Sequence, residues 1–413
     1  MWDSIMVMKY DVIIVGAGPA GATAAYQAAM AGLDTLLLEK HSLPRIKPCG
    51  GAVMQRALNV IDERIPPRIM ERKIFGLKFV FPDSEEAEFV SKEKLGITVF
   101  RSKFDEFLAR RAESRGATLL EEAEVVAACA DEECATVRLR NGREFKGSYL
   151  IGADGVNSIV SRSLGLRPKR REPHSIGLGM ETHVHVGEEA VMEAMNGRPE
   201  VLQIIPVKNR LSYGWVFAKK DHLAIGVAGA SAHMHPLRPI FNRFHTRMES
   251  HLGIDLPIDK RYTYFLGGRG VLGPNVCKRA VLVGDAAGFV DPLMGEGIAY
   301  AMRSAVLAVN TIQECREKEW ASAKHLMKYH DSCRQEFRGN FQVAEWFGLR
   351  GTSFAEWLLK KAEGHEISHK ILAGLARGDI GYVDLPLIIL RELPSELPSV
   401  IQKMVRSRIS SQK

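Results

Sequence analysis

The fold of this chain is decided by the stretch Gly16-Ala17-Gly18-Pro19-Ala20-Gly21. An apolar segment before it, Tyr10 to Val15, predicts a strand, and a run of small residues after it predicts a helix to about Met30. A glycine-rich turn between a strand and a helix directs backbone N–H groups and the positive end of the helix dipole toward a pyrophosphate. Glu39, which ends a second predicted strand 18 residues past Gly21, is well placed to bind ribose hydroxyls. The segment therefore predicts a dinucleotide-binding site.

A second motif, in the last third of the chain, distinguishes between the dinucleotides. A predicted strand, Ala280 to Val283, leads into Gly284-Asp285-Ala286-Ala287-Gly288, and Gly295-Glu296-Gly297-Ile298 follows at the start of another helix. Asp285 can bind the hydroxyls of a ribityl chain, and a helix N-terminus near the flavin ring can stabilise negative charge. This combination favours FAD over NAD as the cofactor.

The composition is compatible with a large enzyme and disfavours several other classes. With 413 residues, of which 46% are apolar, the chain can bury one large core or two medium cores. Its six cysteines form no CxxC pair and show no metal-ligand spacing, which indicates a reducing compartment. The histidines are scattered without a carboxylate-rich motif, so we predict no metal site. The sequence contains no nucleic-acid-binding motif, and nucleic acid is not an expected partner.

The net charge of +7 and the chain end bear on where the protein works. One basic cluster, Lys169-Arg170-Arg171, is either a solvated face or a site that attracts anionic lipid or a phosphorylated substrate. We find no cleavable signal and no convincing membrane span, and expect a cytoplasmic protein. Residues Val400 to Lys413 place apolar and basic residues at helical spacing. They predict either a helix packed on the body or a peripheral anchor on the inner face of the cell membrane.

The order of predicted elements indicates an α/β (α+β) fold with two interleaved domains and a helical end. A Rossmann-like FAD-binding domain is expected to comprise residues 1–74, 98–175 and 267–330. A mostly antiparallel sheet domain is expected to comprise residues 75–97 and 176–266, and residues 331–413 to form a helical C-terminal region. Locally, the pattern predicts one helix that begins near Val53 and another in which Ser102 is the N-cap.

Several motifs together resemble known flavoproteins. The glycine pattern, Asp154-Gly155 and Gly284-Asp285 resemble the para-hydroxybenzoate hydroxylase-type flavoprotein fold. Within that group, Lys47-Pro48-Cys49-Gly50-Gly51 and Tyr213-Gly214-Trp215-Val216-Phe217 resemble the geranylgeranyl reductase family. The similarity runs from about Tyr10 to Ile312, and Ala218 stands where the family's YxWxFP segment has proline.

This resemblance implies FAD-dependent saturation of isoprenoid double bonds. The substrates of the family include archaeal membrane lipids, as in digeranylgeranylglycerophospholipid reductases, and the tails of chlorophyll and quinones. The resemblance also implies that the sheet domain, residues 176–266, binds the prenyl chain.

The chemistry of alkene reduction gives the aromatic segment and the cysteine possible roles. A hydride must pass from flavin N5 to one carbon and a proton to the other, with reacting atoms roughly 3–3.5 Å apart. Tyr213, Trp215 and Phe217 alternate along a predicted strand, so they form either the floor of a prenyl tunnel or ordinary core packing. Cys49 is either a small residue where the backbone approaches the flavin or a thiol that steers flavin or substrate, or supplies a proton. The catalytic candidates are Cys49, Tyr213 and Trp215, and the substrate-binding candidates are Tyr213, Trp215 and Phe217.

The predicted cofactor-binding residues come from all three parts of the FAD-binding domain. Arg101 is expected near the dinucleotide linkage, with a surface ion pair as the alternative, and Val125 is expected to offer backbone contacts to adenine. The N–H groups of Gly297 and Ile298 are expected to face the flavin N1/C2 carbonyl, where reduction places negative charge. The full predicted set is Gly16, Gly18, Ala20, Gly21, Glu39, Cys49, Gly50, Ala52, Arg101, Val125, Asp285, Gly295, Gly297 and Ile298.

Three functions remain open at this stage. A prenyl reductase would act on a prenylated lipid or a prenyl diphosphate and take electrons from NAD(P)H or reduced ferredoxin. An aromatic hydroxylase or related flavin monooxygenase would consume oxygen when substrate is present; a halogenase is disfavoured because the WxWxIP segment is missing. A non-enzymatic prenyl-binding protein would purify without a yellow flavin. The Cys-Gly-Gly segment and the aromatic segment favour the prenyl reductase.

We predict that Asp285→Ala weakens FAD binding, because it removes a charged acceptor for ribose or ribityl hydroxyls. The expected loss is roughly 1.5–3 kcal/mol of binding free energy, measured by titrating the stripped protein with FAD. Full flavin occupancy and unchanged affinity in the variant would contradict the assignment.

Overall fold

A largely parallel sheet surrounds the strand that precedes the glycine turn. The structure is a computed structural model that describes residues 9–81, 85–166, 176–207, 212–268, 271–319, 322–363 and 365–392. β1 (Lys9–Val15) pairs in parallel with β2 (Thr35–Leu38) on one side and with β11 (Glu144–Gly152) on the other. Val12, Ile13 and Ile14 are all 0% exposed, as expected for a parallel strand covered on both faces.

Five further strands complete this sheet. β8 (Thr118–Leu120) and β18 (Ala280–Leu282) extend it in parallel on its two sides. β17 (Val276–Cys277) pairs antiparallel with β18, and β9 (Val125–Ala130) and β10 (Ala135–Leu139) add an antiparallel extension to β11. The glycine turn and Asp285 both follow carboxyl ends of parallel strands, so they meet at one edge of the sheet.

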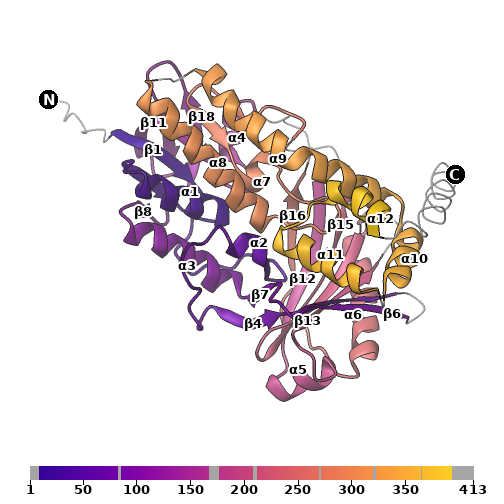
Figure 1. The fold of residues 1–413 in the computed structure, drawn as a ribbon. Coiled ribbons are helices and arrows are strands. Elements are labelled where there is room, and N and C mark those ends of the chain that lie inside the picture. Colours follow the sequence, from indigo (N-terminus) through magenta and orange to yellow (C-terminus); the bar gives the residue numbers. More distant parts are fainter. Residues whose placement is uncertain are drawn as a thin grey trace.

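Helices from distant parts of the sequence pack beside this sheet. α1 (Pro19–Met30) contacts both α3 (Arg101–Ser114) and α8 (Ile298–Glu317), and Figure 1 shows it between them. The short helices α4 (Ile159–Ser163) and α7 (Gly284–Ala287) follow β11 and β18. The predicted α/β fold, with a Rossmann-type FAD-binding arrangement, is confirmed.

A second, mostly antiparallel sheet lies beside the first. Its strand order is β16-β12-β15-β14-β13-β5-β6, and only β13 and β5 pair in parallel. The bounds are β5 Gly76–Val80, β6 Glu86–Val90, β12 Ile176–His185, β13 Val201–Pro206, β14 Ser212–Ala218, β15 His222–Ala230 and β16 Tyr262–Gly267. α6 (Leu237–Leu252) covers one face, where Val216, Val227 and Phe241 share a core; α5 (Glu188–Ala194) and a single turn, Ser231–His233, complete this part.

A small third sheet lies before and after the short helix predicted near Val53. It consists of β3 (Ala52–Met54), β7 (Gly96–Val99) and β4 (Met70–Ile74). The helix is present as α2 (Gln55–Leu58) but begins two residues later than predicted, because Val53 is buried in β3 and pairs with Ile97. Ser102 is also not an N-cap, because α3 already includes Arg101 and the flanking residue is Phe100, which makes no side-chain cap.

The C-terminal helices connect the two large sheets. α9 (Ala323–Leu349) packs on α8, whereas α10 (Thr352–Ala362) and α11 (Glu366–Arg377) contact β6 of the second sheet. A single turn, Tyr382–Asp384, and α12 (Leu385–Glu392) follow, and Figure 1 shows these helices over the second sheet. No helix in the described ranges is long and apolar enough to cross a membrane.

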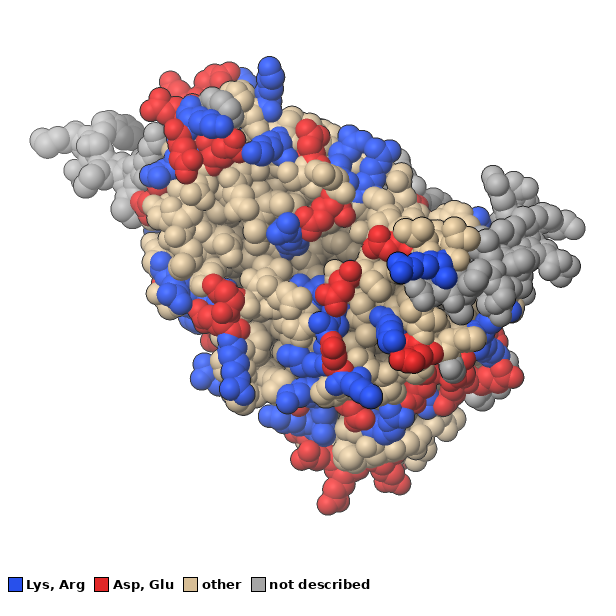
Figure 2. All heavy atoms as spheres, in the orientation of Figure 1, with Lys and Arg blue, Asp and Glu red and all other residues tan. Residues whose placement is uncertain are grey.

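The surface charge is mixed where the structure describes it. Figure 2 shows acidic and basic side chains interspersed over one face of the molecule. The basic cluster Lys169-Arg170-Arg171 and the segment Val400–Lys413 both lie outside the described residues. Their two interpretations therefore stay predictions.

Gly21 holds α1 close to the glycine turn. A Cβ atom at position 21 would lie 1.8 Å from the Gly16 carbonyl oxygen and 3.1 Å from the Ala153 side chain. By contrast, a Cβ atom at Gly18 would meet only Arg45 Nη2, at 3.8 Å, and Gly18 has an ordinary φ of −77°. Packing therefore requires glycine at position 21, whereas Gly18 leaves open space in front of the helix.

We predict that Gly21→Ala lowers the temperature of thermal unfolding, because overpacking of this kind costs roughly 1–3 kcal/mol. Gly18→Ala is the matched control and should unfold close to the parent temperature. Both variants are to be measured by circular dichroism on protein stripped of cofactor. Equal unfolding temperatures for the two variants would contradict the packing argument.

Candidate functional site

One cavity of about 860 Å³ lies where the two large sheets meet. Its volume is in the upper range of small-molecule sites. All the predicted site residues except Gly21 line it, including the glycine turn, Glu39, Arg101, Asp285 and the three aromatic residues of β14. Gly21 instead lies behind the turn, where it packs against Gly16. The sequence motifs, from Gly16 to Ile298, therefore converge on a single site.

The carboxylate of Glu39 is fixed by the glycine turn at one end of the cavity. Ala17 N–H donates to Glu39 Oε2 at 3.0 Å, and Arg45 Nε lies 3.2 Å from the same oxygen. Glu39 is 3% exposed. Val125, at the start of β9, also lines the cavity. This arrangement orients a buried carboxylate toward the place predicted for the ribose.

A group of buried cations lies beside the glycine turn. Arg101 donates to Asp105 through Nε and Nη2, at 2.7 and 2.9 Å, and Arg45 donates to the same carboxylate at 3.1 Å. Arg101 is only 8% exposed, so its ion pair is not the surface pair considered from the sequence. Although burial opposes it, the Asp105 carboxylate holds the pKa of Arg101 well above its usual range. The two guanidinium groups share the Asp105 carboxylate and both line the cavity, so their remaining N–H groups are available to a pyrophosphate.

Asp285 and Lys47 both line the cavity, and their charges influence one another. Burial raises the pKa of Asp285, and the charges of Lys47 and Arg101 oppose that rise. Burial likewise lowers the pKa of Lys47, and Asp285 opposes that change. The turn after Asp285 is close, since a Cβ atom at Gly297 would lie 3.3 Å from Asp285 Oδ1.

The loop that contains Cys49 packs directly on the aromatic face of β14. A Cβ atom at Gly50 would lie 2.7 Å from Trp215 Nε1 and 2.8 Å from the Phe217 ring. The ring of Trp215 also covers Gly226 on β15, where a Cβ atom would lie 2.2 Å from it. Two glycines thus make room for one indole between the loop and the sheet.

The aromatic residues of β14 face the cavity rather than the core under α6. Tyr213, Trp215 and Phe217 line the cavity, with neighbouring ring centroids 6.0 and 6.2 Å apart, whereas Val216 packs under α6. Strand β14 runs through Ala218, which pairs with Leu223, and Lys219 N–H donates to the His222 carbonyl to close the hairpin. Alanine in place of the family's proline therefore leaves a regular strand end.

Tyr213 ties the aromatic face to the loop before α8. Its hydroxyl donates to the Met294 carbonyl, and a Cβ atom at Gly295 would lie 2.6 Å from the same hydroxyl. Burial raises the pKa of Tyr213, and the charges of Asp291, Cys49 and Glu296 raise it further. The phenol therefore stays protonated and acts as a hydrogen-bond donor to the backbone.

The sequence did not identify one complete wall of the cavity. Side chains from α9 to α12 line it, and they are mostly apolar: Phe347, Phe354, Leu358, Leu359, Leu372, Leu375, Tyr382 and Leu385. These helices carry amphipathic patterns but no motif, so nothing in the sequence indicated what their apolar faces contact. Buried polar residues were missed as well, among them Arg56, which donates to Glu296 at 2.7 Å, and Glu181 and Lys219 below the Cys49 loop.

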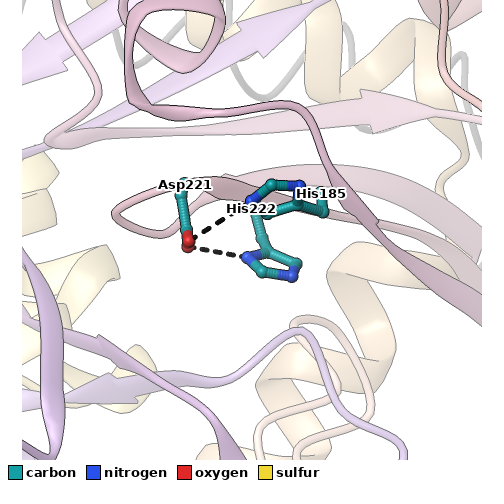
Figure 3. Close-up of side chains that lie close together, drawn as sticks. All are labelled: His185, Asp221 and His222. Carbon is teal, nitrogen blue, oxygen red and sulfur yellow. Dashed lines mark hydrogen bonds and ion pairs between the residues drawn. The ribbon is translucent and has the colours of Figure 1, made fainter.

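The fold brings His185 beside Asp221 and His222, which are adjacent in the sequence, as Figure 3 shows. His222 Nδ1 lies 2.7 Å from Asp221 Oδ1, and His185 Nε2 lies 3.5 Å from Asp221 Oδ2. The hydrogen bond from His222 lowers the pKa of Asp221. The possible ligand atoms lie within 4.8 Å of one another, whereas the ligands of a tetrahedral zinc ion are roughly 3.4 Å apart. We assign the group to polar contacts that hold the hairpin against β12.

The cavity fits FAD by shape and by unmet hydrogen bonds. At Gly16, φ is +100° and a Cβ atom would lie 2.6 Å from the Ala153 carbonyl oxygen, so the turn can only be bare backbone there. Asp154 Oδ1 and Trp215 Nε1 are buried and have no hydrogen-bond partner among the described residues, and both residues line the cavity. A bound dinucleotide would supply polar groups at both ends.

Comparisons with known proteins agree with this geometry. The family model described as "FAD binding domain" matches residues 9–343. A digeranylgeranylglycerophospholipid reductase from Methanopyrus kandleri is 29% identical over 82% of this chain and 89% of its own length. A menaquinone reductase from Mycobacterium tuberculosis is 29% identical over 73% of this chain and 76% of its own length.

A solved structure shares the fold over nearly the whole chain. It is that of a geranylgeranyl bacteriochlorophyll reductase-like protein from Thermoplasma acidophilum, with a TM-score of 0.76 and 22% identity, covering 96% of this chain and 99% of that one. The predicted resemblance and the predicted FAD cofactor are thereby confirmed. The chain belongs to the FAD-binding domain family and is an FAD-dependent oxidoreductase related to geranylgeranyl reductases.

Proposed function

We propose that the protein saturates carbon–carbon double bonds of an isoprenoid chain, in a geranylgeranyl lipid of membrane-lipid biosynthesis. The observation that carries this proposal is the continuity of the cavity. It runs from the glycine turn past Cys49 and Trp215 into a space walled by apolar side chains of α10 and α11. A long apolar chain suits that space better than a small aromatic acid does.

Different residues of the cavity have different proposed roles in the reaction. Reduced FAD supplies the hydride when it is bound. Trp215 and Phe217 hold the alkene on the cavity floor, and the walls of α10 and α11 exclude water. We assign delivery of the proton to the Cys49 thiol, because Cys49 lines the cavity next to Gly50, which packs on Trp215 and Phe217. Tyr213 is unsuited to that role, because its hydroxyl is committed to the Met294 carbonyl and its pKa is raised by burial.

The substrate class follows from the relatives together with the cavity. The Methanopyrus kandleri relative is named for a digeranylgeranylglycerophospholipid, which supports a prenylated lipid as the substrate here. A prenyl diphosphate is the second candidate, and NAD(P)H or reduced ferredoxin is the proposed electron donor. Anaerobic mixing of the oxidised protein with each donor, followed at the flavin absorption band, distinguishes between the two.

We predict that Trp215→Ala and Cys49→Ala both lower turnover while FAD stays bound. The first variant opens the floor of the cavity, and the second removes the proposed proton donor. Phe265→Ala and Cys129→Ala are the matched controls, because Phe265 is 39% exposed, Cys129 is exposed, and neither lines the cavity. Turnover is to be measured by mass spectrometry of geranylgeranyl diphosphate. Rates and product patterns equal to the parent in both variants would assign these residues to structure alone.

We further propose that the protein meets its lipid at an anionic membrane surface. Leu385 of α12 lines the cavity, while Leu387 and Leu390 on the same helix are 69% and 51% exposed. An exposed apolar patch of this kind beside a lipid-sized cavity suits partial insertion among head groups. The basic residues of the segment 400–413 would add attraction to anionic lipid.

We predict salt-sensitive cosedimentation with vesicles of phosphatidylglycerol and phosphatidylcholine. The double variant Leu387→Ser/Leu390→Ser and a deletion of residues 399–413 should each weaken it. Met30→Ser is the control, because Met30 is 54% exposed on α1, away from the C-terminal helices. Absence of binding by the parent, or binding indifferent to both changes, would reject this surface as an anchor.

A further inference from the structure

Two buried side chains, Glu181 and Lys219, hydrogen-bond to the backbone of the Cys49 loop on either side of the Cys49–Gly50 peptide group. The N–H of Cys49 donates to Glu181 Oε1, and Lys219 Nζ donates to the Gly50 carbonyl oxygen at 2.8 Å. Glu181 lies on β12 and Lys219 directly follows β14, so both belong to the second sheet. The loop precedes β3 and carries the residues that face the predicted flavin position.

Burying the side chains of Glu181 and Lys219 costs free energy, and their hydrogen bonds to the loop offset that cost only in part. Lys219 is 0% exposed and Glu181 is 1% exposed. Removing such charges from water is unfavourable unless hydrogen bonds compensate, and a buried ion is weak evidence for stability. Glu181 Oε2 also has no hydrogen-bond partner among the described residues. Positioning of the Cys49 loop therefore explains the presence of Glu181 and Lys219 better than a contribution to the stability of the fold does.

The loop itself has little freedom apart from these two bonds. Gly51 has a φ of +82°, and a Cβ atom there would lie 2.1 Å from the Val99 carbonyl oxygen and 3.1 Å from Lys219 Nζ. On its other side Gly50 touches Trp215 and Phe217. The distance of the loop backbone from the aromatic floor is thus set by contacts with rings and by the two hydrogen bonds from Glu181 and Lys219.

We propose that Glu181 and Lys219 are positioning residues that fix the backbone of Cys49 and Gly50 over Trp215 and Phe217, and so set the geometry in which the flavin ring and the substrate chain meet. The link to an isoprenoid chain rests on the proposed function. The link to the flavin rests only on the cavity and on the FAD-binding family.

The Lys219 ammonium also makes this contact sensitive to pH. Burial lowers the pKa of Lys219 to about 8, although the charges of Glu181, Cys49 and Glu71 oppose the change. Below that pH the donor is charged and the bond to Gly50 is strong; as pH rises through it, the amine becomes neutral and the bond weakens. The other groups around the pair are Arg72, which donates to the Lys219 carbonyl, Lys103, which pairs with Glu71, His183, which lies 3.5 Å from Glu181, and the Phe100 ring.

The test measures the visible circular dichroism of bound FAD from pH 6.5 to 9.5, since that signal reports the surroundings of the flavin without any substrate. We expect the parent to show a transition near pH 8 and Lys219→Met to lack it. Lys219→Arg should keep the signal of the charged state across the range. Lys220→Met is the matched control, because the neighbouring lysine is exposed on the same hairpin, and it should retain the transition.

The Glu181 contact is tested separately by Glu181→Gln, which keeps an acceptor oxygen, and Glu181→Leu, which does not. Glu181→Leu should alter the flavin signal more than Glu181→Gln, and the exposed control Glu189→Gln should leave it unchanged.

With geranylgeranyl diphosphate as the probe, Lys219→Met should lower kcat by about tenfold or more, because small misplacements are costly. KM and the FAD dissociation constant should stay within about twofold.

Several outcomes would overturn the proposal. One is a Lys219→Met protein that keeps the parent's pH transition and flavin signal. Another is loss of FAD from Lys219→Met and also from the charge-balanced Lys219→Met/Glu181→Gln variant, which would make the pair structural. If no protein reduces the probe but the flavin signals behave as expected, the positioning role stands and the proposed function fails.

Discussion

The site depends on the contact between the bare backbone of Gly50 and the aromatic face of β14. The ring atoms of Trp215 and Phe217 approach the position of a Cβ atom at Gly50 to 2.7 and 2.8 Å. The loop connects β2 of the first sheet to β3 of the small third sheet, and the rings belong to the second sheet. The loop and the rings line the same cavity. A larger residue at position 50 would separate the two surfaces whose proximity any transfer between flavin and substrate requires.

Several buried charged residues lie around this cavity. Arg101, Asp105, Glu181 and Lys219 are all buried, and each has a partner on the cavity wall or on a loop that forms it. Such groups cost free energy when they are taken out of water. By contrast, the aliphatic and aromatic side chains that pack under α6 and around β1 gain free energy from burial. We therefore propose that the charges around the cavity serve binding and positioning rather than stability.

The sequence predicted the parts of the site that depend on local backbone geometry. The glycine turn, Asp285 and the alternation of Tyr213, Trp215 and Phe217 are short-range patterns, and all of them converge on the cavity. The helix expected near Val53 begins only at Gln55, because Val53 pairs with Ile97 in β3. Glu181, Lys219 and the apolar wall from α10 and α11 could not be identified, because their partners are distant in sequence. In the sequence, Lys219 resembles a solvated turn residue after a strand. Its hydrogen bond to the Gly50 carbonyl is visible only in the folded structure.

The central claim is that this flavin site reduces isoprenoid double bonds. The most direct measurement is mass spectrometry of geranylgeranyl diphosphate after anaerobic incubation with the chemically reduced protein, with flavin absorption recorded in parallel. We expect a product that has gained two hydrogen atoms per reduced double bond, with stoichiometric reoxidation of the flavin. An unchanged probe and a flavin that is reoxidised only when oxygen is admitted, with oxygen incorporated into an added aromatic substrate, would contradict it.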